Sequence, residues 1–196
     1  MINALYEPFP ECITVEGKDY PILTDYREWL RFADMIRDQA VDKREKVVML
    51  ACWFTIQPKQ LTGDMINALF DFYHARQLEP DVDDEDDEED DEDETVFKPP
   101  VFDWRIDSRY ILGDFRRYYN IDLLSIDYLH WWEFRCLFAA LPDDSQCQKR
   151  MAYRSINLGS IKNDTERARI AQIQRSIAIP YECDDDMVAA AFGGLI

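Results

Sequence analysis

The chain has 196 residues and a formal net charge of −18, from 40 acidic and 22 basic side chains. Fourteen of the sixteen residues from Glu79 to Glu94 are acidic and none is basic, so the other 180 residues carry 26 acids against 22 bases. This balance disfavours general nucleic-acid binding, which needs clustered Lys and Arg. A hydrophobic fraction of 47% supports a folded core outside the acidic tract.

The first half of the chain predicts a short hairpin and three helices. Apolar runs on either side of Gly17 predict strands at 12–15 and 20–23, with 16–19 as the turn. Thr24 is expected to cap the first helix, and Thr62 is expected to cap the third. The second helix is expected to be capped by Asp42 with Glu45 and to be ended by Pro58. Their predicted inward residues are Tyr26, Trp29, Leu30, Ala33 and Ile36, then Val47, Leu50, Ala51 and Phe54, then Met65, Ile66, Leu69, Phe70 and Tyr73.

The acidic tract predicts a disordered loop over residues 79–100, since charges of one sign repel and keep a chain solvated. We expect residues 1–78 to form a hairpin and helices, 101–180 to be the C-terminal helical part of the same domain, and 181–196 to be a tail. The tract is interpreted as a solvated linker, as a partner for the basic segment Lys149–Arg175, or, least favoured, as a DNA mimic.

The second half predicts four helices, which makes the fold mainly α with about seven helices. The first is expected to start at Asp103 or Asp107 and to end near Asn120. Ser125–Ala140 has apolar residues on nearly every side, which is typical of a central buried helix. Asp143 with Gln146 is expected to start a helix that ends near Ser155, and Asp164 or Thr165 one that ends near Ile177.

The chemistry-bearing residues favour structural roles. His130, with Asp127 and Glu133 three residues away on either side, is interpreted as a structural polar group that bonds a backbone carbonyl, because no nucleophile motif accompanies it. Trp131 and Trp132 point about 100° apart on a helix, so core packing is favoured over a stacking platform. No catalytic, cofactor-binding or metal site is expected: the nucleotide-binding glycine motifs and zinc or EF-hand spacings are absent from the sequence.

Five scattered cysteines without paired spacing favour a reducing cytoplasm, and no apolar stretch approaches the ~20 residues that a membrane span needs. Segment Lys149–Arg175 holds seven bases and two acids. Within it, Tyr153-Arg154 is interpreted as a structural clamp in which the guanidinium bonds carbonyls or Asp122.

The sequence resembles a tailed-phage family, the gene-product-fifteen family, named after a Listeria phage protein. The similarity extends from about Val15 to Pro180. The residues that carry it are Gly17, Tyr20-x-Ile22, Thr24-Asp25-x-Arg27, Phe102-Asp103, Asp107-x-x-Tyr110-Ile111, Tyr119-x-Ile121-Asp122-Leu123, Leu129-His130-Trp131-Trp132-x-Phe134, Leu141-Pro142 and Tyr153-Arg154.

The resemblance implies a non-enzymatic tail assembly chaperone, encoded near the tape-measure gene, that acts in the host bacterial cytoplasm and is absent from the mature virion. Its expected partners are the tape-measure protein, the major tail (tube) protein and a second copy of itself, with no direct contact to nucleic acid or membrane. The alternative is an acidic inhibitor or DNA mimic that acts on a host nucleic-acid-binding protein. The candidate partner-binding residues lie in the last helix and the tail: Arg167, Ala168, Ala171, Arg175, Ile177, Met187 and Phe192.

Overall fold

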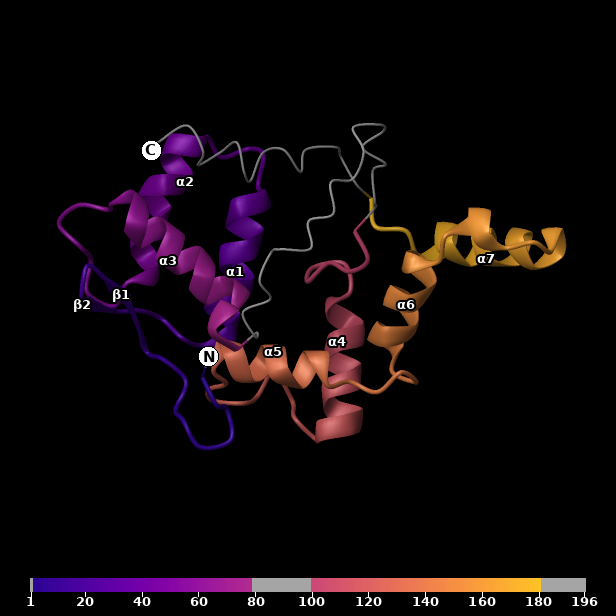
Figure 1. The fold of residues 1–196 in the computed structure, drawn as a ribbon, viewed down its shortest axis with the longest axis horizontal. Coiled ribbons are helices and arrows are strands. Elements are labelled where there is room, and N and C mark those ends of the chain that lie inside the picture. Colours follow the sequence, from indigo (N-terminus) through magenta and orange to yellow (C-terminus); the bar gives the residue numbers. More distant parts are fainter. Residues whose placement is uncertain (1, 79–99, 181–196) are drawn as a thin grey trace, which may run out of the picture. The chain divides into compact units, whose positions relative to one another are not determined.

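The computed structural model describes residues 2–78 and 100–180, which contain seven α-helices and one two-stranded antiparallel sheet (Figure 1). The predicted fold class, mainly α with an N-terminal hairpin, is confirmed. Contacts divide these residues into a first unit, residues 2–78 with 128–135, and a second unit, residues 100–127 with 136–180. The predicted acidic loop, apart from Pro100, and the predicted tail 181–196 lie outside the described residues.

The hairpin consists of β1 (Cys12–Val15) and β2 (Lys18–Pro21), with Val15 paired to Lys18. Glu16 and Gly17 both have positive φ, 51° and 74°, as a two-residue turn with the twist of the flanking strands requires. The turn is therefore shorter than predicted, and the second strand begins two residues earlier. That strand ends at Pro21, whose carbonyl accepts a hydrogen bond from the Thr55 N–H at 3.0 Å.

Helix α1 (Tyr26–Arg37) is capped by Asp25, which accepts from the Arg27 N–H at 2.9 Å. The predicted cap, Thr24, is wrong by one residue, because the Thr24 hydroxyl is hydrogen-bonded to the Tyr128 hydroxyl at 2.7 Å and the Asp25 side chain caps the helix instead. The face of α1 in the core is also wider than predicted, since it adds Phe32 and Met35 while Leu30 and Ile36 are only half-buried.

Helix α2 (Lys43–Leu50) is capped by Asp42 as predicted, but it ends at Leu50, well before Pro58. A 3-10 turn, Ala51–Trp53, follows it, and Phe54 is buried outside the helix in a β-bridge with Ile22. Helix α3 (Gly63–His74) is capped by Thr62, as predicted, and ends at Ala75, whose φ of 54° stops the helix. A second 3-10 turn, Arg76–Leu78, closes this part of the chain.

Helix α5 (Trp131–Ala139) starts six residues later than predicted. Residues before it are extended, because the Leu129 carbonyl accepts from the Tyr26 N–H at 2.9 Å and His130 pairs with Asp25 in a β-bridge. Its first five residues belong to the first unit and its last four to the second. Glu133, Cys136 and Ala139 are exposed, so the prediction that this helix is buried on nearly every side is wrong.

The second unit also contains α4, α6 and α7. Helix α4 (Ser108–Asp114) continues into a π-helical turn, Phe115–Tyr119, and stops at Asn120, where φ is 56°. Helix α6 (Gln146–Ser155) is capped by Ser145 rather than Asp143, and α7 (Asp164–Ile177) is capped by Asn163. A 3-10 turn, Leu158–Ser160, lies between them. Asp107 begins α4, and both α6 and α7 end where the sequence indicates.

Candidate partner-binding surfaces and the polar core of the second unit

A buried ion pair lies at the centre of the second unit. The Arg154 guanidinium, from α6, meets the Asp107 carboxylate, which begins α4, in two parallel contacts of 2.6 and 2.9 Å. Both side chains are only 5% exposed. Such bidentate geometry is the strongest that this pair of groups can form, and the loss of either partner would leave an uncompensated buried charge.

The same guanidinium donates to two backbone carbonyls, that of Val101 at 3.0 Å and that of Ile177 at 2.8 Å. Arg154 therefore joins the start of the unit, the start of α4 and the end of α7. The carbonyl part of the predicted clamp is confirmed. The Asp122 part is wrong, because Asp122 accepts from Arg116 at 2.7 Å on the surface, and this bond lowers the pKa of Asp122 below its ordinary value.

A second buried carboxylate, Asp114, receives the first two N–H groups of α6. Its oxygens accept from Gln146 at 3.1 Å and from Cys147 at 2.8 Å, while the Ser145 hydroxyl accepts from Gln148 at 3.1 Å. A negative charge at a helix N-terminus is favourable because the unpaired N–H groups carry positive partial charge. Burial first, and then the Asp114 carboxylate, raise the pKa of the Cys147 thiol, so this cysteine stays protonated.

Two arginines converge on one tyrosine at the packed α4 and α6 helices. The Arg150 guanidinium lies 3.6 Å from the centroid of the Tyr110 ring, and that of Arg109 lies 4.6 Å from it. Both donate to the Tyr110 hydroxyl, Arg109 at 2.6 Å. No sequence pattern indicates this cluster, because Arg150 is 40 residues from Tyr110.

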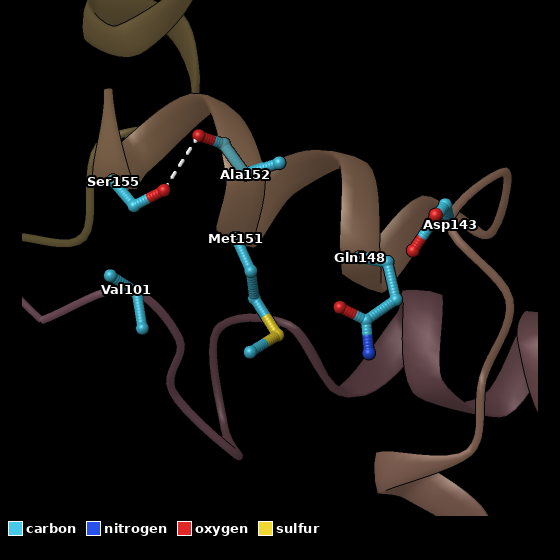
Figure 2. Close-up of a pocket in the computed structure, with 6 residues that line it drawn as sticks. All are labelled: Val101, Asp143, Gln148, Met151, Ala152 and Ser155. Atoms are coloured by element: carbon cyan, nitrogen blue, oxygen red, sulfur yellow. Dashed lines mark hydrogen bonds between the residues drawn. The ribbon is translucent and has the colours of Figure 1, made fainter.

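A shallow pocket of about 340 Å³ lies beside α6 in the second unit (Figure 2). Val101, Met151 and Ala152 supply apolar atoms to it, and Asp143 and Gln148 supply polar ones. The Ser155 hydroxyl donates to the Ala152 carbonyl at 2.9 Å, so its proton is already used. The pocket residues include no histidine or cysteine that would pair with this serine as a nucleophile or base.

Helix α7 presents a mostly polar outer face. Arg167, Ala168 and Arg175 are exposed, whereas Ala171 and Ile177 are half-buried and Ile170 is fully buried against the unit. The apolar stripe of α7 thus packs partly on its own unit. The other two candidate residues, Met187 and Phe192, lie outside the described residues.

The basic segment Lys149–Arg175 carries fewer unpaired positive charges than its composition indicates. Besides Arg154, Arg167 pairs with Asp164, and Arg169 pairs with Glu166 at 3.1 Å. Its remaining cations include Lys149 and Lys162, which are exposed, and the half-buried Arg150.

In the first unit, His130 and the two tryptophans have the structural roles that the sequence indicates. The His130 Nε2 lies 3.1 Å from the Pro10 carbonyl, and its Nδ1 accepts from the Trp132 N–H at 3.0 Å. Because His130 precedes α5, Asp127 does not share a helix face with it. Trp131 and Trp132 are fully buried, and their indole N–H groups donate to the Tyr73 and Phe72 carbonyls, each at 2.8 Å.

An exposed apolar face on α2 was not predicted. Val48 is 73% exposed and Met49 is 40% exposed, and Cys52, one turn after Val48, is exposed as well. The predicted inward stripe of this helix is Val47, Leu50, Ala51 and Phe54, and it leaves out Val48 and Met49. Two further apolar residues outside that stripe are the signal that indicates an exposed apolar face. We call Val48, Met49 and Cys52 the α2 face.

Within residues 2–78 and 100–180, no group of three or more His, Cys, Asp or Glu side chains is placed to hold a metal ion. None of the helices described there has both the length and the apolar character that crossing a membrane requires.

Comparison with protein families places the chain among bacteriophage proteins. It belongs to the Bacteriophage Gp15 protein family, whose model matches residues 5–179, and this supports a role in phage structure or assembly. No curated protein and no solved structure shows a significant match to the chain.

Proposed function

We propose that the chain is a non-enzymatic chaperone of phage tail assembly, which binds the tape-measure protein and helps recruit tail-tube subunits. The observation that supports this proposal is the family match over residues 5–179. The chaperone acts in the host cytoplasm and does not remain in the virion, so its detection at stoichiometric level in purified phage would contradict the proposal.

Co-expression tests the chaperone role directly. The full chain is produced together with the tape-measure protein from the same phage genome, and the soluble fraction of the tape-measure protein is measured. We expect that fraction to rise several-fold relative to expression without the chain. An unchanged fraction overturns the proposal.

The α2 face is the better candidate for an apolar client contact, because α7 turns its apolar residues partly inward. An amphipathic client helix would bury its apolar side on Val48 and Met49. In a pull-down, the double variant Val48→Ser/Met49→Ser should recover less tape-measure protein than the unaltered chain. Leu124→Ser is the matched control, since Leu124 is 75% exposed in the second unit.

Two further pull-downs test the C-terminal candidates. Ala168→Glu places a charge on the exposed side of α7, and a chain that ends at Pro180 lacks Met187 and Phe192. Reduced recovery of the tape-measure protein with either one assigns that segment to the contact. Recovery equal to that of the unaltered chain shows that the altered segment does not contribute to the contact.

A further inference from the structure

The Arg109–Tyr110–Arg150 cluster has an excess of hydrogen-bond donors and positive charge. Two guanidinium groups donate to a single phenol oxygen, which accepts both through its two lone pairs. The phenol proton is then left to donate. No acceptor for it lies within hydrogen-bond distance among the described residues, and no carboxylate there forms an ion pair with Arg109 or Arg150.

Two buried carboxylates of the second unit, Asp107 and Asp114, already have hydrogen-bond partners. The pKa of the Cys147 thiol is affected by Asp107, Asp114 and Arg150, so these three groups lie close to one another. However, Asp107 accepts from Arg154 with both oxygens, and Asp114 accepts from the first two N–H groups of α6 with both of its oxygens. Neither is available to compensate two further cations.

The Arg150 side chain supplies a second, independent observation. Its Nε atom is buried and has no hydrogen-bond partner among the described residues. A buried donor without an acceptor is unfavourable, and two like charges held on one ring repel each other. An anion that bridges Arg109, Arg150 and the Tyr110 hydroxyl would relieve the repulsion between the two cations and accept the phenol proton.

We propose that Arg109, Tyr110 and Arg150 form a binding site for carboxylates of an acidic peptide segment. Planar guanidinium groups suit a carboxylate because each can offer two parallel N–H donors. This site goes beyond the chaperone function and does not depend on it.

Two sources can supply the carboxylates: the chain's own residues 79–94, or an acidic segment of a partner. Glu94 is seven residues from Val101, a reach of up to about 24 Å. Val101 is bonded to Arg154, and Arg150 is four residues, or about 6 Å, from Arg154 along α6. The chain's own tract is therefore within reach of the site.

Binding of a labelled acidic peptide tests the proposal. The probe is a fluorescein-labelled 16-residue peptide with the sequence of residues 79–94, and fluorescence anisotropy is measured with the full chain. The same measurement is made with a full chain in which the acidic residues of 79–94 are replaced by Asn and Gln. We expect the neutralised chain to bind the probe, and Arg109→Gln in that background to weaken binding about tenfold or more.

Arg169→Gln is the matched control, because it removes one exposed positive charge from the same unit at another helix. It should change the affinity by less than about twofold, as expected for a distant surface charge. Equal losses from Arg109→Gln and Arg169→Gln, or no binding to the neutralised chain, overturn the proposal.

The comparison of the two chains identifies the source. If the unaltered chain binds the probe much more weakly than the neutralised chain, its own tract occupies the site. If both chains bind it equally, and Arg109→Gln weakens both, the site is open to the carboxylates of a partner.

Discussion

The two units of the protein bury different kinds of side chain. The first is packed with aromatic rings, and its fully buried residues include Trp29, Phe32, Trp131 and Trp132. The second buries fewer rings and encloses two carboxylates, Asp107 and Asp114, together with Arg154, whereas the first encloses Lys46 and His130. Apolar burial is non-directional, whereas a buried charge requires a partner in a fixed geometry. The second unit should therefore depend more steeply on single polar groups.

The tryptophans of the first unit combine both kinds of interaction. Four of the five tryptophans of the chain lie in this unit, and each donates its indole N–H to a backbone carbonyl of the unit. Large rings provide apolar area, and the N–H group fixes their orientation. Tryptophan fluorescence consequently reports mainly on the first unit, while Trp104 is the reporter within the second.

Removal of Arg154 should give the largest effect. Arg154→Met leaves the buried Asp107 carboxylate without its cation and removes the donors to Val101 and Ile177. We expect the free energy of unfolding to fall by about 3–5 kcal/mol, measured by denaturant titration, with faster amide exchange in α6. The double variant Asp107→Leu/Arg154→Met should recover part of the loss. A single variant as stable as the double would contradict a role for the pair.

Trp132→Phe tests the first unit. The change removes the donor to the Phe72 carbonyl and leaves a small cavity, so a loss of about 2 kcal/mol is expected in the same titration. Trp104→Phe, at a half-buried position of the second unit, is the control and should cost less. If the two substitutions have equal effects, burial of the indole does not distinguish the units.

Asp114→Asn should have a smaller effect on the second unit. It removes the negative charge and one of the two acceptors at the N-terminus of α6, at a cost of about 1–2 kcal/mol. Amide exchange of Gln146 and Cys147 is the specific measurement. Unchanged protection of those two amides would show that Ser145 alone is sufficient to cap α6.

The smallest expected effect is a pH dependence of the first unit. Burial lowers the pKa of His130 below its ordinary value of 6.5, so the folded protein keeps this imidazole neutral. As the pH falls below 6.5, the unfolded chain takes up a proton that the folded chain does not, and stability decreases until the folded pKa is reached. His130→Gln should flatten this part of the pH profile in tryptophan-detected unfolding. If the variant and the unaltered protein have identical pH profiles, His130 is not the source of this loss of stability.

Local signals in the sequence were the most reliable ones. Asp42 and Thr62 were predicted as caps because a cap depends on residues two or three positions away. The Thr24 cap and the start of α5 are predicted wrongly because Thr24 is bonded to Tyr128 and Trp131, which are more than 100 residues away in the chain. No periodicity within one segment contains that information.

The polar core of the second unit also depends on pairings between residues that are far apart in the sequence. Arg154 was recognised as a clamp, but its partner Asp107 is 47 residues away, and Asp122 was an equally plausible acidic group. The Tyr110–Arg150 contact spans 40 residues and could not be inferred at all. Pairings of this kind depend on which helices pack together, and this packing is decided by the whole core.

The bonds from Arg154 to Val101 and Ile177 have a consequence for multivalent binding. Val101 follows residues 79–99 in the sequence, and Ile177 precedes residues 181–196. The Arg154 guanidinium donates to the carbonyls of both residues, at 3.0 Å to Val101 and 2.8 Å to Ile177. The two attachment points are therefore adjacent. A partner that engages sequence on both sides would meet its second contact at a high effective concentration, set by short tethers, so two weak contacts would combine into strong avidity. Arg154 thereby couples segments that are about 80 residues apart in the chain.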